Sequence, residues 1–301
     1  MKPVDILLAL AVVLIWGFNF VVIQIGLHGL PPLLFSGLRF LFAALPLVFF
    51  IQRPAIPWKL LAGYALFQFT IQFMLLFTGI QLGFPAGLAS LVMQLQAFFT
   101  IGLAVLMLGE RPQAAQLLGA LIAFAGMGLV ALHLEVTATV IGFVLLVGGA
   151  LSWAVANILT KKIGKVNPLG LMVWGSLLAA PPLLLGSLVV EGPAAWSAAA
   201  THLGWITVGA VLFQSYPNTI FGFGVWSNLM RRYPTATIAP FTLLVPVSGM
   251  ISAALVLDEP LQWWKIVAGL LVLGGLALNQ FGGRLWAPRA AAGRAGGTCR
   301  N

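Results

Sequence analysis

The sequence predicts an all-α polytopic membrane protein, with ten transmembrane helices arranged as two inverted repeats of five helices. Three observations lead to this fold class: a very apolar composition, a regular series of apolar segments, and a one-sided distribution of positive charge. Of the 301 residues, 61% are hydrophobic and only 7% are charged, whereas a soluble domain has roughly 25% charged residues. Such a chain cannot cover a globular core with polar surface, so we expect the lipid bilayer to surround it.

Ten apolar segments are long enough to cross a hydrocarbon layer of about 30 Å as helices. The predicted spans are residues 4–25, 33–51, 58–80, 86–108, 114–132, 138–160, 168–190, 203–227, 236–257 and 263–282. The first segment continues without a small-residue cleavage pattern, so we interpret it as a span rather than a signal peptide. Residues 287–301 are mostly Ala, Gly and Arg, which predicts a disordered cytoplasmic tail.

The positive residues predict which ends of the helices face the cytoplasm. With a cytoplasmic N-terminus, thirteen of the 15 Lys and Arg residues fall on the cytoplasmic side, Lys265 falls outside, and Arg39 lies within a span. Positive charge is usually concentrated in cytoplasmic loops, so both termini should be cytoplasmic. The net charge of +9 is scattered between apolar segments, which argues against nucleic-acid binding. The single cysteine, Cys299, excludes an intrachain disulfide and a cysteine metal cluster.

Residues 85–110 form the most distinctive stretch, and a related stretch follows at residues 234–259. Both begin with proline, both end with glutamate, and they lie 149 positions apart. The terminal glutamates, Glu110 and Glu259, should lie at opposite membrane faces. We expect each to cap or close its own end of a helix pair, in spans four–five or nine–ten.

Other matches support a repeat of five spans. Leu66-Phe67-Gln68 recurs as Leu212-Phe213-Gln214, and Trp16 matches Trp153, in the same order in both halves. Five is an odd number, so the two copies should insert with opposite orientation, as in many secondary transporters. We therefore expect one repeat at residues 1–135 and the other at residues 136–286.

Short motifs in both halves resemble a known transporter family. They are Ile15-Trp16-Gly17-Phe18-Asn19-Phe20, Gly37-Leu38-Arg39-Phe40, Pro85-Ala86-Gly87-Leu88-Ala89-Ser90-Leu91, Gly109-Glu110-Arg111, Trp153-Ala154-Val155-Ala156-Asn157, Pro234-Thr235-Ala236, Leu244-Val245-Pro246-Val247 and Asp258-Glu259. On these residues the chain resembles the EamA-type exporters of the drug/metabolite transporter superfamily, over residues 4–283. The resemblance implies export of amino acids and related small metabolites, including cysteine-pathway ones, across the bacterial inner membrane by alternating access.

Arg39 is the one charged residue well inside a predicted span, about 10 Å from the outer end of its helix. In a functional role it would bind a substrate carboxylate or make a gate contact. In a structural role its long side chain would reach outward or bond to backbone carbonyls. The equivalent position in the second half is Gly175, so the repeat itself does not require this arginine.

Polar and tryptophan side chains at mid-depth are the other candidates for a substrate cavity. They are Trp16, Asn19, Gln68, Gln72, Gln94, Trp153, Asn157, Gln214 and Tyr216. Amides are costly in hydrocarbon unless they are paired or face a cavity. They could therefore hold helices together, or line a site at the interface of the repeats, which the matching depth of Gln68 and Gln214 favours. The tryptophans could line the path or pack against neighbouring helices.

Function is predicted by elimination as well as by resemblance. An intramembrane enzyme needs a nucleophile–base pair, a metal cluster or paired carboxylates, and no acidic residue lies deep within a span. We therefore expect a transporter without a cofactor, acting on small molecules within the lipid bilayer as a monomer or a weak dimer. A passive facilitator, or a multidrug or lipid-moving carrier of the same fold, is the alternative.

Overall fold

Helices make up the regular structure of the described residues, which are 1–134, 139–201 and 204–285. The computed structural model contains, in chain order, α1 (Pro3–Gly26), α2 (Pro32–Ala44), η1 (Leu47–Phe49), α3 (Trp58–Ala65), η2 (Leu66–Ile71), α4 (Gln72–Gln81), α5 (Ala86–Val92), α6 (Leu95–Leu108), α7 (Ala114–Ala131), α9 (Val140–Ile163), α10 (Pro168–Val190), α11 (Gly192–Thr201), α12 (Trp205–Phe213), η3 (Gln214–Phe221), α13 (Gly222–Arg232), α14 (Thr235–Ile238), η4 (Ala239–Leu243), α15 (Leu244–Val256) and α16 (Trp263–Leu285). The tail predicted for residues 287–301 and the junction predicted between residues 135 and 136 lie outside the described residues.

Eight helical stretches among the described residues are long and apolar enough to cross a bilayer. A ninth candidate joins α11 to the stretch Trp205–Arg232 through a bend of 109°. The tenth predicted span, residues 236–257, forms a shorter apolar helix, Pro240–Val256. The chain is therefore an all-α polytopic membrane protein, and the number ten stays a prediction.

α11 is a helix that the sequence analysis did not predict, because residues 191–202 were expected to be a connection. Gly192 has φ +82°, a conformation that glycine adopts readily, and it lets the chain turn where α10 ends. The indole N–H of Trp196 in α11 donates to the Ser187 hydroxyl of α10 at 2.8 Å. The alanine-rich sequence after Gly192 then favours a helix in this position.

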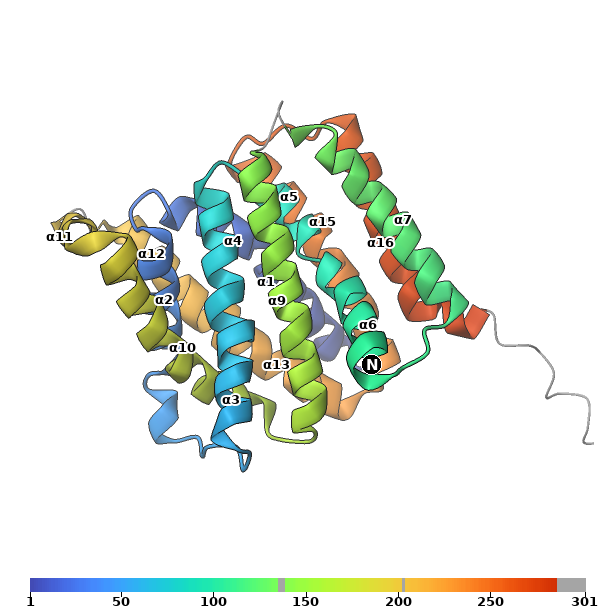
Figure 1. Ribbon diagram of the computed structural model, residues 1–301, viewed down its shortest axis with the longest axis horizontal. Coiled ribbons are helices and arrows are strands. Elements are labelled where there is room, and N and C mark those ends of the chain that lie inside the picture. The colour runs from blue at the N-terminus through green and yellow to red at the C-terminus, as the bar shows by residue number, and fades with distance from the viewer. Residues whose placement is uncertain (135–138, 202–203, 286–301) are drawn as a thin grey trace, which may run out of the picture.

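Helices from the two halves pack against each other in matching pairs (Figure 1). α7 packs on α16 at one edge of the bundle, and α2 packs on α10. α1 packs on α15, while its counterpart α9 packs on α6. The backbones of α7 and α16 approach closely, and a Cβ added to Gly119 would lie 2.5 Å from the Gly275 carbonyl oxygen. Small residues permit such close helix packing in membranes.

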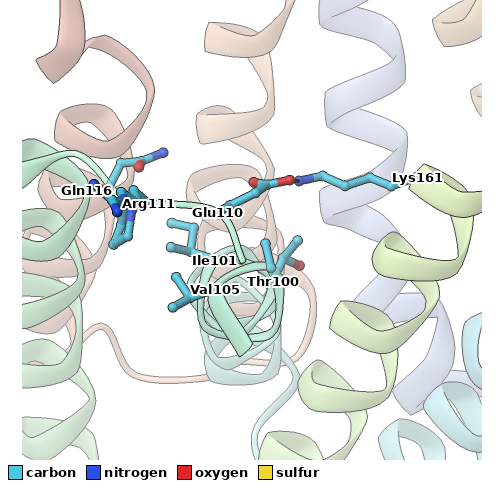
Figure 2. A pocket seen from close by; sticks show the side chains of 9 residues that line it. Thr100, Ile101, Val105, Glu110, Arg111, Gln116 and Lys161 are labelled. Carbon is cyan, nitrogen blue, oxygen red and sulfur yellow. Dashed lines mark hydrogen bonds and ion pairs between the residues drawn. The ribbon is translucent and has the colours of Figure 1, made fainter. Parts of the chain in front are cut away.

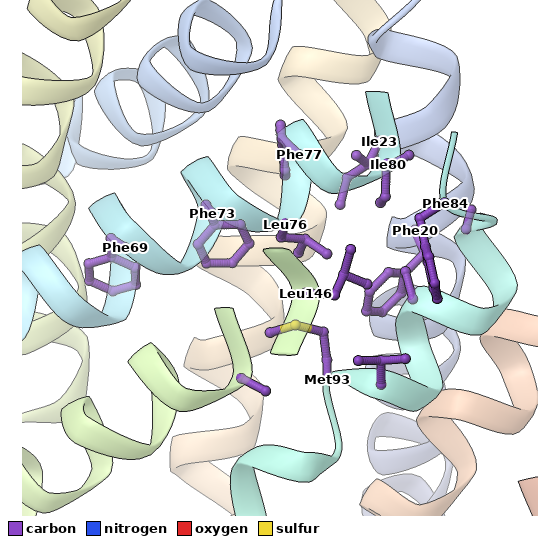
Figure 3. Packing of buried hydrophobic residues seen from close by; sticks show 14 of the residues in the cluster. Phe20, Ile23, Phe69, Phe73, Leu76, Phe77, Ile80, Phe84, Met93 and Leu146 are labelled. Carbon is purple, nitrogen blue, oxygen red and sulfur yellow. The ribbon is translucent and has the colours of Figure 1, made fainter. Parts of the chain in front are cut away.

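Aromatic side chains fill the centre of the bundle (Figure 3). Phe69, Phe73 and Phe77 follow one another at four-residue spacing, so they lie on one face of η2 and α4. The Phe73 ring packs against the Phe77 ring at a centroid distance of 5.9 Å and against the Phe40 ring of α2 at 5.2 Å. This aromatic face holds α2 and α4 together beside the polar residues described next.

Candidate functional site

Two π-helical segments, η2 and η3, interrupt corresponding spans, and each contains one of the matched glutamines. In η3 Pro217 has no N–H to donate to the carbonyl of Phe213, so the regular α-helical bond is missing there. Thr70 in η2 and Thr219 in η3 each donate a hydroxyl hydrogen bond to the carbonyl five residues earlier, at 3.5 and 2.8 Å. Widened turns of this kind are frequent at functional sites because they redirect side chains.

Arg39 lies at the boundary between α2 and η3, and only 2% of its surface is exposed. Its guanidinium donates to the Thr219 hydroxyl through Nη2 at 3.2 Å and Nε at 3.4 Å. The guanidinium carbon lies 4.1 Å from the centroid of the Phe73 ring and 5.0 Å from that of Phe40. The Nη1 atom is buried and has no hydrogen-bond partner. No acidic side chain pairs with Arg39 among the residues that the structure describes.

Gln214 connects α1 with η3 and is completely buried. Its amide nitrogen donates to the backbone carbonyl of Asn19 at 3.2 Å, and its amide oxygen accepts from Asn218 Nδ2 at 3.4 Å. The Asn19 and Asn218 side-chain oxygens are both buried without a hydrogen-bond partner. A single hydrogen-bonded network therefore links Asn19, Gln214, Asn218, Thr219 and Arg39, which we call the Arg39 network. Its fully buried atoms without a partner are one donor, Arg39 Nη1, and two acceptors, Asn19 Oδ1 and Asn218 Oδ1.

The repeat equivalents of these polar residues are paired differently. Gln68 Nε2 donates to Gln72 Oε1 at 3.1 Å within one helix. Asn157 Nδ2 donates to Gln96 Oε1 at 2.7 Å and to the Thr100 hydroxyl at 3.0 Å, joining α9 to α6. The Asn157 bonds hold two helices together, and none of the amides named here is among the buried groups without a partner.

Of the remaining candidates, one is hydrogen-bonded to the Arg39 network and three are not. The Trp16 indole donates to the Asn218 carbonyl at 3.1 Å, so Trp16 touches the network. Trp153 packs against the apolar core. Gln94 is half-buried at the start of α6, and its side chain forms no hydrogen bond with the described part of the chain. Tyr216 is 38% exposed and forms none of the network's bonds.

Asn218 and Thr219 are the members that the sequence analysis did not select. A signal for Asn218 was present, because it follows Gln214 by four residues as Gln72 follows Gln68. Thr219 could not be found in this way. It reaches the network only because η3 is π-helical and places a side chain five residues after Gln214 beside its carbonyl.

A cavity of about 120 Å³ opens at the end of α6, close to Glu110 (Figure 2). Thr100, Ile101 and Gln116 line it, and the Glu110 carboxylate reaches across to the Lys161 ammonium at 2.8 Å. Thr100 is also bonded to Asn157. The cavity therefore borders the Asn157 group and does not include a member of the Arg39 network.

Comparison with known proteins identifies the family. The model of the EamA-like transporter family matches the chain twice, at residues 4–132 and 140–281. The chain belongs to this family. It is therefore a membrane transporter and not an enzyme. The two matches also agree with a chain built from two repeats.

Two relatives match almost the whole chain. A protein of Salmonella typhimurium named "Probable amino-acid metabolite efflux pump" is 43% identical over 292 residues, covering 95% of this chain and 97% of its own length. A protein of the same name from Escherichia coli K12 is 42% identical over 289 residues, covering 94% and 96%. One solved crystal structure superposes with a TM-score of 0.64 at 19% identity, covering 97% of this chain and all of its own. That likeness supports the fold alone.

Proposed function

We propose that this EamA-family transporter exports amino acids and closely related metabolites across the bacterial inner membrane by alternating access. The names of the two relatives at 43% and 42% identity point to this substrate class. A helical polytopic protein belongs to the inner membrane of such bacteria, because spanning proteins of the outer membrane are β-barrels.

The observation that supports this proposal best is the set of unused groups in the Arg39 network. An amino acid has a carboxylate, which accepts hydrogen bonds, and an ammonium, which donates them. The network offers one buried unpaired donor, Arg39 Nη1, and two buried unpaired acceptors, Asn19 Oδ1 and Asn218 Oδ1. We infer that the guanidinium binds the substrate carboxylate and that the two amide oxygens receive the ammonium.

The surroundings of Arg39 can stabilise its positive charge while no substrate carboxylate is bound. An unpaired charge in a membrane is costly, and the Phe73 and Phe40 rings offset part of this cost by cation–π contact. A permanent acidic partner would compete with the substrate, and none is bonded to Arg39 in the described part of the chain. The rings also leave apolar walls around the site. Selectivity among side chains should be weak, since one methylene changes binding by about 1–3 kcal/mol.

We further propose ten spans in two inverted halves, with both termini cytoplasmic. The reciprocal packing of α1 on α15 and of α9 on α6 supports a two-fold relation between the halves. α1 begins, and α9 ends, at the end of the bundle that contains Glu110, Lys161 and Arg232, which we call the Glu110 end. Under this topology the Glu110 end is cytoplasmic and the opposite Glu259 end is external. The Arg39 network joins residues of both halves, so one chain suffices and we expect a monomer or a weak dimer.

Counterflow in proteoliposomes tests the proposal. Vesicles would be preloaded with unlabelled amino acid, and uptake of labelled amino acid would be measured in the presence of competitors. An intact amino acid should compete, whereas its methyl ester, its N-acetyl derivative and the decarboxylated amine should not. Equal competition by apolar amines or lipids would instead support a multidrug or lipid-moving carrier. Flux without saturation or counterflow would indicate a passive facilitator.

A further inference from the structure

Glu110 lies just after the end of α6 and Glu259 just after the end of α15, and the two turns have the same backbone geometry. The residue before each glutamate is left-handed, with φ +66° at Gly109 and +54° at Asp258. The backbone N–H of each glutamate donates to the carbonyl of the alanine six residues earlier, at 3.2 and 3.3 Å. Any difference between the two carboxylates therefore arises from how the helices around them are arranged and not from their own turns.

The two carboxylates have different partners. Glu259 bonds across to the other half, where the backbone N–H groups of Ala86 and Gly87 donate to it at 2.7 and 3.1 Å. Glu110 also bonds to the other half, but to a side chain: it pairs with Lys161 of α9, and both side chains are about half exposed. Our expectation that each glutamate closes its own helix pair is therefore wrong: Glu259 binds α5 of the first half, and Glu110 binds Lys161 of α9 in the second half.

The cavities beside the two glutamates are equivalent under the repeat. Ile101, Glu110 and Gln116 line the cavity of about 120 Å³, and residues 149 positions later, Met250, Glu259 and Lys265, line a cavity of only about 10 Å³. The smaller volume holds one water at most. The same site is thus open at the Glu110 end and filled at the Glu259 end.

The start of α5 fills the smaller cavity, with Gly87 and Leu88 among its lining residues. Leu88 is 1% exposed. Its repeat equivalent, Thr237, lies at the start of the segment that continues into α15, and Thr237 is exposed and does not line the larger cavity. Thr237 therefore does not fill the Glu110 cavity in the way that Leu88 fills the Glu259 cavity.

We propose that Glu110 and Glu259 act as reciprocal latches. Glu259 holds α5 and closes the Glu259 end in the conformation described here. In the opposite conformation Glu259 releases α5, and Glu110 leaves Lys161 to accept from the backbone N–H groups at residues 235 and 236 while residues 236 and 237 fill its cavity. This inference rests on the proposed alternating access, and it explains how one end opens only when the other closes.

One difference between the halves favours closure at the Glu259 end. A Cβ added to Gly87 would lie 3.0 Å from the Glu259 carboxylate and 3.1 Å from the Ala253 side chain, so glycine permits the tightest contact. The equivalent residue is Ala236, whose methyl group must be accommodated when the Glu110 end closes. Gly87→Ala should remove this advantage without removing either carboxylate.

Two single cysteines can report whether each cavity is open, and the measurement needs no substrate. In a Cys299→Ser background, Ile101→Cys reports the Glu110 cavity and Met250→Cys reports the Glu259 cavity. Each would be labelled by an impermeant maleimide in inside-out and right-side-out membrane vesicles. With the native latches, Ile101→Cys should react fast and Met250→Cys slowly. Failure of the amino-acid competition test would leave this measurement unaffected, so the two proposals can fail separately.

Glu259→Gln should shift the equilibrium about tenfold or more, as expected for the loss of a charge-assisted hydrogen bond. Labelling of Met250→Cys should rise and that of Ile101→Cys should fall. Adding Glu110→Gln should restore labelling of Ile101→Cys, because the second latch is then lost as well. Gly87→Ala should act like Glu259→Gln and serves as the test if that variant folds poorly.

Glu191→Gln is the matched control. Glu191 also accepts from the N–H groups at the start of a helix, those of Leu33 and Leu34 at 2.6 and 3.1 Å. At the offset of 136 that relates Arg39 to Gly175, its repeat equivalent is Ala55, which has no carboxylate. It should leave both labelling rates unchanged. The proposal would be overturned if Glu110→Gln had no effect on Ile101→Cys labelling in the Glu259→Gln background. It would also fail if neither Glu259→Gln nor Gly87→Ala exposed Met250→Cys.

Discussion

Arg39 of the first half donates to the Thr219 hydroxyl of the second half at 3.2 Å, deep within the bundle. The Thr219 hydroxyl in turn donates to the Gln214 carbonyl at 2.8 Å. Because this connection crosses between the halves, a substrate held by the guanidinium would contact both of them at once. Binding at such a place can favour one arrangement of the halves over the other, which is the requirement for a ligand to drive a conformational change.

Arg39→Gln should reduce amino-acid counterflow at least about tenfold, because a hydrogen bond to a charged group contributes about 1.5–3 kcal/mol. The melting temperature of the purified variant should stay the same or rise, since the substitution removes a buried charge that has no acidic partner. Counterflow and thermal unfolding in the same detergent would check both. A purely structural arginine would produce the reverse, with lower stability and normal transport per folded molecule.

Arg53→Gln is a control with similar chemistry. The Arg53 guanidinium also stacks on an aromatic ring, that of Trp58 at 4.4 Å, and bonds to the Ile56 carbonyl. It lies before α3 and outside the Arg39 network. Transport should therefore remain close to that of the unmodified protein, and a loss equal to that of Arg39→Gln would show that the assay reports general damage.

Asn218→Leu should raise the KM for amino acids about tenfold and leave the inhibition by deaminated carboxylates nearly unchanged. The substitution removes an unbonded buried oxygen that we assign to the substrate ammonium, a contact of about 1.5–3 kcal/mol. The backbone carbonyl that accepts from Trp16 is retained. Competition curves with an amino acid and its deaminated analogue would separate the two effects. Equal losses for both analogues would argue against an ammonium site at Asn218.

Gln214→Leu should impair transport more than Gln68→Leu. Gln214 bonds at both ends of its amide, and its loss would remove a contact to the Asn19 carbonyl of α1 and leave the Asn218 amide nitrogen without its partner. Gln68 bonds only to Gln72 within the same span. Leucine suits a packed helix, so both variants should insert, and flux normalised to folded protein is the measurement. A larger effect of Gln68→Leu would move the site to the first half.

The sequence predicted the membrane class, the family and several members of the Arg39 network. The membrane class follows from hydropathy and charge because the bilayer requires long apolar segments and favours positive charge on one side. Polar residues within those apolar segments are easily recognised. It did not predict which polar residues meet. Face predictions assume 3.6 residues per turn, and the π-helical turns at Gln68 and Gln214 break that period. Thr219 therefore reaches the network, while Tyr216 is exposed.

The partner of Glu259 could not be predicted for a different reason. Repeated sequences predict equivalent local structures, and Glu110 and Glu259 do share a local geometry. Under the proposed alternating access, a single conformation gives equivalent residues unequal surroundings, since one end is closed and the other is open. Under the latch proposal the contact of Glu259 with Ala86 in the opposite half belongs to that conformation, and the repeat in the sequence does not distinguish one conformation from another.

Single cysteines in a Cys299→Ser background should establish the topology, including whether residues 236–257 cross the membrane. His28→Cys, Ala194→Cys and Leu261→Cys should react with an impermeant maleimide added to intact cells, because these exposed positions follow an odd number of predicted spans. Lys59→Cys and Lys162→Cys, which follow an even number, should react only after the membrane is opened. Leu261 is the decisive position. If residues 236–257 do not cross, it stays cytoplasmic and unlabelled, and the count falls below ten.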